Sequence, residues 1–176
     1  MRKFLYIALT VIAIILFYQG LQKIGSSQGS LGCRVIKGSI FDGDTLRVKC
    51  QGEKLRIRFA CVDAPEIRQE NGIASRDHLR SIINRSNNQI AIKTVDVDRY
   101  GRIVAEVYAN NELVQLQQAK DGMVWAYEKY KRNCPHWKDI NKAFSQARSQ
   151  KRGIFLKKNA IPPWEWRKQE RRARNR

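Results

Sequence analysis

Arg58-Phe59-Ala60-Cys61-Val62-Asp63-Ala64-Pro65-Glu66 is the stretch of this sequence on which the fold prediction depends. It has the character of a strand, and Pro65 ends the strand because its ring fixes φ and removes a backbone donor. Arg58 lies inside the strand, and Asp63 and Glu66 follow at its end. Charges gathered at one rim of a sheet predict a functional site, although an ordinary turn with solvated acids would give the same nine residues.

The residues just before this stretch predict the strands that pair with it. Apolar residues on both sides of Asp42-Gly43-Asp44 predict a β-hairpin, since Asp-Gly favours a tight turn. After a second turn at Gln51-Gly52, cations alternate with apolar residues from Lys54 to Phe59. One face of this third strand is therefore apolar and the other positively charged.

The rest of the chain alternates helices with a second hairpin. We expect a helix over Gly72–Arg85 capped by Asn71, a hairpin that turns at Asp98–Arg102, and further helices over 113–120 and from about Trp137 to Gly153. Hairpins interrupted by helices predict an α+β domain built on a small antiparallel barrel.

The charge balance limits the partners of this domain. The 34 Lys and Arg residues outnumber the 16 Asp and Glu residues, which gives a net charge of +18. Such an excess is typical of proteins that bind nucleic acid or an anionic membrane surface. Segment 157–176 is a basic tail with two tryptophans, and its sequence fits either polyanion.

The N-terminal segment predicts export. Arg2 and Lys3 precede fifteen uncharged residues, Phe4–Tyr18, a length between that of a signal-peptide core and that of a spanning helix. We therefore expect residues 1–22 to be either a cleaved signal peptide or an uncleaved membrane anchor, and residues 23–32 to be a flexible linker. In both cases the folded domain, residues 33–156, lies outside the cytoplasm, secreted or membrane-anchored.

An exported domain can keep disulfides, which decides how its four cysteines are interpreted. Cys33 and Cys50 lie on the two arms of the first hairpin and form the preferred pair. Cys61 and Cys134 then form a second pair, or Cys61 is a buried free thiol. Without a Cys-x-x-Cys or paired histidines a zinc site is disfavoured, and His78 and His136 are interpreted as surface residues.

Four separated motifs together resemble the staphylococcal nuclease (thermonuclease) family. They span about residues 33–155 and are Asp42-Gly43-Asp44-Thr45, Arg58 with Val62-Asp63-Ala64-Pro65-Glu66, Asp98-Arg99-Tyr100-Gly101-Arg102, and Gly122 with Trp125-Ala126-Tyr127. The resemblance implies an OB-type five-stranded barrel with three α-helices. It also implies a monomeric, calcium-dependent endonuclease that hydrolyses DNA and RNA, prefers flexible or single-stranded substrate and leaves 3′-phosphate ends.

The resemblance also implies a role for each matching residue. The calcium ligands would be the carboxylates of Asp44 and Asp63 and the backbone carbonyl of Ala64, where many members have threonine. Glu66 would be the general base, and Arg58 and Arg102 would be the two phosphate-binding arginines. Arg99 and Tyr100 would contact a terminal phosphate. Tyr127 would be the base-stacking tyrosine, although it is one residue out of register.

The chemistry of phosphodiester hydrolysis asks for the same residue types. The substrate is anionic, so a hard cation on oxygen ligands and two forked guanidinium groups offset its charge as water attacks. A carboxylate beside them, Glu66, can accept the proton of that water. A non-catalytic nucleic-acid-binding module of the same fold is the alternative, but degenerate domains of that kind lose Arg58, Glu66 and Arg102.

Overall fold

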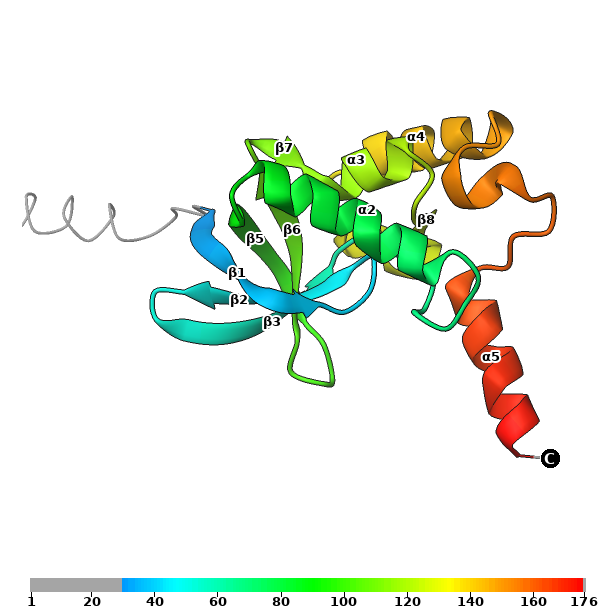
Figure 1. Cartoon of the computed structure of the whole chain (residues 1–176), viewed down its shortest axis with the longest axis horizontal. Coiled ribbons are helices and arrows are strands. Elements are labelled where there is room, and N and C mark those ends of the chain that lie inside the picture. Colours follow the sequence, from blue (N-terminus) through cyan, green and yellow to red (C-terminus); the bar gives the residue numbers. More distant parts are fainter. Residues whose placement is uncertain (1–29, 176) are drawn as a thin grey trace, which may run out of the picture.

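The computed structural model describes residues 30–175, and five of its strands form a closed barrel (Figure 1). These strands are β1 (Leu31–Ile40), β2 (Thr45–Cys50), β3 (Glu53–Phe59), β5 (Gln89–Val97) and β6 (Ile103–Ala109). They pair in the order β3-β2-β1-β5-β6, and β3 pairs again with β6 to close the barrel. The predicted α+β barrel is thereby confirmed. The closing pair is parallel, whereas the other pairs are antiparallel.

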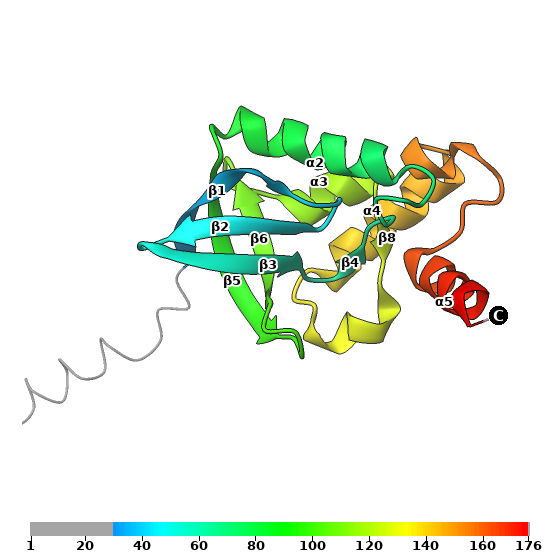
Figure 2. The same cartoon turned by 60° about the horizontal axis from the view of Figure 1, so that its bottom comes forward.

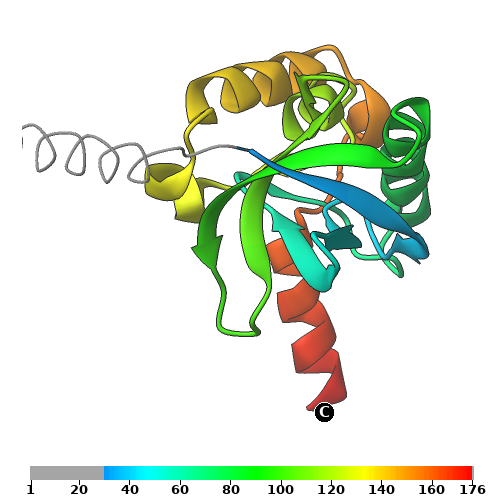
Figure 3. The ribbon, with the colours of Figure 1, turned by 90° about the vertical axis from the view of Figure 1, so that its left-hand side faces the viewer.

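Three helices of the described residues cover the barrel on one side, namely α2 (Gly72–Arg85), α3 (Val114–Lys120) and α4 (Trp137–Ser149). A fourth helix, α5 (Pro163–Arg174), projects away from the domain (Figures 1 and 3). In Figure 2, α2 runs across the barrel above β1, with α3 behind it. The helix predicted over Gly72–Arg85 has these bounds, but the side chain of Asn71 makes no capping hydrogen bond, so the predicted cap is wrong.

Short elements complete the chain. They are the strands β4 (Val62–Asp63), β7 (Glu112–Leu113) and β8 (Trp125–Ala126) and the 3₁₀ helices η1 (Glu128–Asn133) and η2 (Gly153–Leu156). The predicted signal peptide or anchor, residues 1–22, and most of the predicted linker lie outside the described residues. Within residues 30–175, no helix has the length and apolar character needed to cross a membrane.

The core fills the barrel and the space between barrel and helices. Alternation along β2 and β3 turns Leu46, Val48, Ile57 and Phe59 inward, where each side chain is almost fully buried. Leu79 and Ile83 of α2 and Ile140 of α4 pack against them in the same cluster. This cluster fixes β2 and β3, the two strands that lead into the candidate site.

Two disulfides tie the domain together. Cys33–Cys50 links β1 to the end of β2, and Cys61–Cys134 joins the turn after β3 to the loop before α4, 73 residues later. Both predicted pairs are present, and Cys61 is therefore not a free thiol. Cys61 adopts a left-handed backbone conformation, with φ at 73°, so the second disulfide lies at the point where the chain turns from β3 into β4.

The segment predicted only as a basic tail contains α5, and its start is packed onto the domain. Gln69 Nε2 donates a hydrogen bond of 2.6 Å to the carbonyl of Ile161. Trp164 stacks on Tyr127 with ring centroids 5.2 Å apart and lies 5.9 Å from the ring of Trp125, edge to face. These contacts place the first turn of α5 beside β8.

Candidate active site

The register of the β2–β3 pair brings Asp44 beside Arg58. Thr45 pairs with Arg58 across β2 and β3, and the amide of Phe59 donates to the carbonyl of Asp44 at 2.8 Å. The turn itself needs glycine, because a Cβ on Gly43 would clash with the Oγ of Ser75 in α2. Asp44 is thus held between the hairpin and the helix.

Arg58 binds two buried carboxylates at once. Its Nη1 hydrogen-bonds to Oδ1 of Asp44, and its Nη2 to Oδ1 of Asp63 at 2.6 Å. Both acids have no exposed side-chain surface, while Arg58 keeps 16% of its own. Burial works against the charge of Arg58, but the two acids outweigh it and raise the pKa of this guanidinium.

Asp44 remains under-compensated in spite of these contacts. Its Oδ1 also accepts from the hydroxyl of Thr45 at 3.0 Å, and its Oδ2 accepts from the amide of Ala64 at 2.6 Å. Burial, together with the nearby Asp42 and Asp63, still raises the pKa of Asp44 well above its usual value, although Arg58 lowers it. Such a carboxylate favours a further cation nearby.

The two-stranded sheet of β4 and β8 positions Asp63. Asp63 pairs with Trp125, and the amide of Tyr127 donates to the carbonyl of Cys61 at 2.9 Å. This sheet therefore carries the acid on one strand and leads to an aromatic ring on the other. Burial, followed by the charge of Asp63, raises the pKa of the Tyr127 hydroxyl.

Glu66 lies in the turn between β4 and α2. Its amide donates to Oε1 of Gln69 at 3.2 Å, and its carbonyl accepts from the amide of Gln69 at 2.8 Å. The turn is packed so closely against α2 that a Cβ on Gly72 would meet the carbonyl oxygen of Glu66. The side chain of Glu66, 34% exposed, is therefore presented from a fixed backbone.

Arg167, a residue of the C-terminal tail to which the sequence assigned no role, completes the cluster. Arg167 of α5 binds Asp63 through both nitrogens, Nη2 to Oδ2 at 2.6 Å and Nη1 to Oδ1 at 3.2 Å. The same Nη1 donates to Oε1 of Glu66 at 2.7 Å. Burial opposes the charge of Arg167, but the two carboxylates raise its pKa. Asp44, Arg58, Asp63, Glu66 and Arg167 thus form one continuous chain of ion pairs.

Arg102 contacts residues of its own hairpin instead of the ion-pair chain. Its Nε donates to Oδ2 of Asp98 at 2.7 Å, and its guanidinium lies over the ring of Tyr100 at 5.6 Å. The next residue, Ile103, pairs with Ile57 of β3, so Arg102 directly precedes β6, the strand beside the one that carries Arg58. An approach of Arg102 to the phosphate opposite Arg58 stays a prediction.

The predicted substrate-contacting residues divide into two groups. Arg99 and Tyr100 occupy the exposed tip of the β5–β6 hairpin, where Nη2 of Arg99 donates to the Tyr100 hydroxyl at 2.7 Å. Tyr127 lies near Asp63, but Trp164 of α5 stacks on one face of its ring. The tip of the hairpin and α5 project on the same side of the barrel in Figures 1 and 3.

The oxygen donors present fit a hard divalent cation. Asp44 and Asp63 are buried carboxylates joined through one guanidinium, and the carbonyl of Ala64 accepts no hydrogen bond from residues 30–175. Carboxylate and carbonyl oxygens are the ligands that calcium and magnesium prefer. Among the described residues, no three His, Cys, Asp or Glu side chains cluster closely enough to form a site alone, because arginines lie between the acids.

Comparison with known proteins agrees with this geometry. The model of the staphylococcal nuclease homologue family matches residues 56–157, more than half of the chain. The chain belongs to the staphylococcal nuclease family. A Haemophilus influenzae relative named an uncharacterized endonuclease is 36% identical over 140 residues, which cover 79% of this chain and 74% of that protein.

Two other relatives have names that specify the class of nuclease. A Shigella flexneri protein named micrococcal nuclease is 34% identical over 145 residues, 77% of this chain and 81% of its own. A rice protein named probable staphylococcal-like nuclease CAN2 is 31% identical over 159 residues, which cover 89% of this chain but 39% of the rice protein. The staphylococcal nuclease family member described here is thus a nuclease, a phosphodiester hydrolase.

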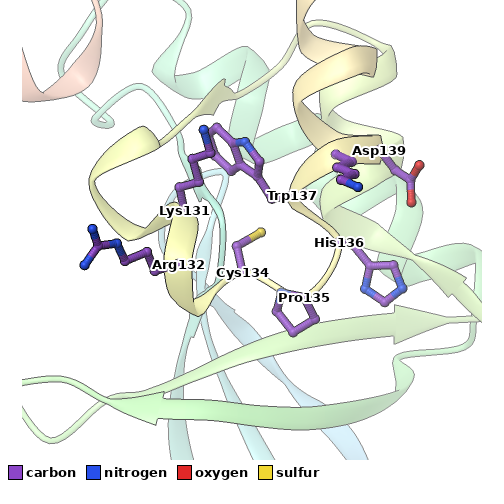
Figure 4. Close-up of a pocket in the computed structure, with 8 residues that line it drawn as sticks. Lys131, Arg132, Cys134, Pro135, His136, Trp137 and Asp139 are labelled. Carbon is purple, nitrogen blue, oxygen red and sulfur yellow. The ribbon is translucent and has the colours of Figure 1, made fainter.

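One hollow of this nuclease lies away from its ion-pair chain. Residues 131–139, except Asn133, line a hollow of about 680 Å³ around the loop that carries Cys134 (Figure 4). His136, on the rim of this hollow, hydrogen-bonds through Nδ1 to the buried Glu106 at 2.6 Å, and Tyr108 donates to the same acid at 2.9 Å. Of the two histidines predicted to lie on the surface, the side chain of His136 is 43% exposed and that of His78 is 22% exposed.

Proposed function

We propose that this protein is a calcium-dependent endonuclease that acts on flexible or single-stranded DNA and RNA and leaves 3′-phosphate ends. The observation that carries the proposal is the bridge from Asp44 through Arg58 to Asp63. It combines buried acids, which suit a hard cation, with a guanidinium, which suits a phosphate.

Asp44, Asp63 and the carbonyl of Ala64 would hold the ion. A bound calcium would supply positive charge against the phosphate oxygens as water attacks. The buried setting of the two acids strengthens this effect, because charges interact more strongly where water is excluded. The remaining cluster members then act as the protein's own catalytic groups.

Glu66 is the proposed general base. Its side chain is partly exposed, so water can reach it, and its backbone is fixed by Gln69 and by α2. General bases of this kind contribute roughly 10²–10⁴-fold to a rate. Arg58 and Arg102 are proposed to bind the phosphate oxygens. Arg102 would then release its hydrogen bond to Asp98 and donate to the phosphate instead.

The preference for flexible substrate follows from the exposed aromatic groups. Tyr100 is 63% exposed at the hairpin tip, and Arg99 lies over its ring at 4.8 Å. An unpaired base can stack on such a ring, whereas a base inside a duplex cannot. Arg99 and Tyr100 are thus proposed to contact a terminal phosphate and base. Tyr127, whose ring already contacts Trp164 and Tyr130, is proposed to contact a base.

We also propose that the nuclease domain works outside the cytoplasm, secreted or held at the membrane by residues 1–22, as a monomer. The two disulfides support this proposal, because such bonds persist in oxidising compartments. Fractionation of the producing cells and the mass of the mature protein would test it. A reduced, uncleaved chain recovered from the cytosol would contradict it.

Cleavage of denatured DNA and of RNA by the full chain tests the function. Wild-type protein should cleave both in calcium and neither in excess chelator, and phosphatase treatment should be needed before the 3′ ends can be extended. Glu66→Gln should lower the rate by at least about 100-fold while the variant still folds, since an amide oxygen can accept the hydrogen bond of Arg167. Undiminished cleavage in chelator or by Glu66→Gln would refute the mechanism.

A further inference from the structure

A groove beside the ion-pair chain carries a surplus of cations. It has a volume of about 360 Å³ and is lined by Arg68, Trp166, Arg167, Glu170, Arg171 and Arg174. Four guanidinium groups therefore face one carboxylate. Within residues 30–175, no carboxylate lies within 4.0 Å of the guanidinium of Arg68, Arg171 or Arg174. The groove thus has positive charge that no carboxylate of the described residues pairs with.

The groove is also continuous with the candidate active site. Arg167 lines it and at the same time binds Asp63 and Glu66. The α5 helix is anchored at its start by Trp164 and by the Gln69–Ile161 hydrogen bond, so the arginines that follow are displayed in a fixed direction. A polymer that lies along α5 would lead directly to the proposed catalytic acids.

We propose that this groove is a second binding site for the substrate. It holds the phosphates of the nucleotides that flank the bond cut at the active site. The proposal deepens the proposed function and rests on it. Forked guanidinium groups match phosphate oxygens, and the partly buried Trp166 adds an aromatic group on which a base can stack. Contacts to phosphates alone carry no sequence information, so the site predicts affinity without sequence preference.

Binding of a labelled twelve-residue oligothymidylate in excess chelator tests this site without cleavage. The variant Arg68→Gln/Arg171→Gln/Arg174→Gln should bind at least tenfold more weakly than wild type at low salt. Its slope of log affinity against log salt should be flatter by about 2, since each single-strand phosphate contact contributes about 0.7. In cleavage assays the same variant should show a raised KM with little change in kcat.

A variant with the same charge change elsewhere is the control. Lys49→Gln/Lys54→Gln/Arg56→Gln removes three exposed cations from the β2–β3 hairpin, which lies far from α5 in Figure 1. If this variant loses as much affinity as the groove variant, general charge explains binding and the proposal fails. It also fails if the groove variant loses only its binding to phosphatidylglycerol vesicles. Absence of any cleavage by wild type would instead refute the proposed function.

The contacts of Arg167 carry a second, independent inference. Its two nitrogens use both oxygens of Asp63, and Arg58 uses Oδ1 as well. A cation that binds Asp63 must therefore share or replace these hydrogen bonds. Trp164 holds the first turn of α5 in an aromatic cluster. The Arg167 guanidinium therefore stays near Asp63 and Glu66 even when its hydrogen bonds to them break.

We infer that Arg167 is a resident counter-ion that competes with the divalent cation for Asp63. This inference rests on the proposed metal dependence. It makes the apparent affinity for the cation weaker than the acids alone would give, because part of the protein is held in the arginine-bound form. The C-terminal helix thereby sets the cation concentration at which the enzyme works.

Calcium titration of the metal-free full chain by calorimetry tests the competition. Arg167→Gln should bind calcium at least about fivefold more tightly, the lower end of typical coupling between two ligands. Lys168→Gln, an exposed charge on the next residue of α5, should leave the affinity unchanged. Trp164→Ala, which loosens the helix but keeps the arginine, should also tighten binding, so that the result does not depend on one variant.

An unchanged or weaker calcium affinity in Arg167→Gln, with the fold intact by circular dichroism, would overturn the inference. A weaker affinity would mean that Arg167 positions the acids for the metal. If wild-type protein bound no calcium at all, the proposed function itself would fail. The two failures are therefore distinguishable.

Discussion

Arg58 and Asp63 lie five residues apart on opposite sides of the turn at Cys61, and their side chains hydrogen-bond at 2.6 Å. The turn reverses the chain so that the guanidinium on β3 faces the carboxylate on β4. This contact connects β3, the strand that pairs with β2, to β4, the strand that carries the second acid.

Removing Arg58 should therefore damage both stability and activity. Arg58→Gln leaves Asp44 and Asp63 buried without their shared cation, which typically costs about 3–5 kcal/mol of unfolding free energy. Nuclease activity should fall by at least about 100-fold. Urea unfolding and DNA hydrolysis measure the two effects. Arg56→Gln, on the exposed face of the same strand, should change stability by less than about 0.5 kcal/mol, and a comparable loss there would contradict the assignment.

Calcium should stabilise the fold as well as permit cleavage. A ligand present at about 100 times its Kd and bound only by the native state adds about 2.7 kcal/mol to the unfolding free energy. Thermal unfolding with calcium and with chelator should show this difference in wild-type protein. Asp63→Asn should lose it, because the neutral amide no longer attracts the ion. Equal stabilisation of Asp63→Asn would show that calcium binds elsewhere.

Asp98 should make the second hairpin sensitive to acid. Partial burial works in the opposite direction, but hydrogen bonds from the amides of Arg102 and Tyr100 and from the Arg102 side chain lower the pKa of Asp98. A lowered folded-state pKa means that the stabilisation is fully present above the unfolded value, about 3.9, and is lost as pH falls through the folded value. Urea unfolding of wild type and Asp98→Asn should differ by about 1 kcal/mol at pH 7. A difference that stays constant down to pH 2.5 would contradict this account.

The two disulfides should differ in their effect on the site. In the chain-entropy model, a loop closed over 73 residues stabilises by about 4 kcal/mol and one closed over 17 residues by about 3 kcal/mol. Cys61→Ser/Cys134→Ser should therefore cost more stability than Cys33→Ser/Cys50→Ser. It should also lower calcium affinity, since Cys61 lies two residues before Asp63. Equal calcium affinity in the two variants would show that the Cys61–Cys134 disulfide does not position the metal ligands.

The local parts of the fold could be predicted from the sequence because each has a local signal. The Asp-Gly turn, the alternation before Phe59 and the apolar stripe of Gly72–Arg85 gave the hairpins and the first helix. The helix near Trp137 ends at Ser149, before the predicted Gly153. The barrel closure between β3 and β6 is parallel and non-local, and the hairpin pattern predicted an antiparallel barrel without indicating this parallel pair.

Arg167 shows why the rest of the site could not be predicted. It lies 104 residues from Asp63 in a tail rich in arginine, and no period or spacing distinguishes it from Arg171 or Arg174. The signal that was available is the pair of tryptophans, because Trp164 packs into an aromatic cluster and so brings the following turn of helix to the acids. Tryptophans in a basic tail thus indicate that the tail packs against the domain.

The bond between Cys61 and Cys134 links the candidate active site of this nuclease to the redox state of its surroundings, since such bonds persist only in oxidising compartments. A polypeptide that hydrolyses DNA and RNA threatens the cell that synthesises it. In a reducing compartment, the turn before Asp63 would lack its covalent link to the loop before α4. If the protein is exported as proposed, that link forms only after the chain has left the compartment that holds the genome, and a nuclease that needs the link would stay inactive until then.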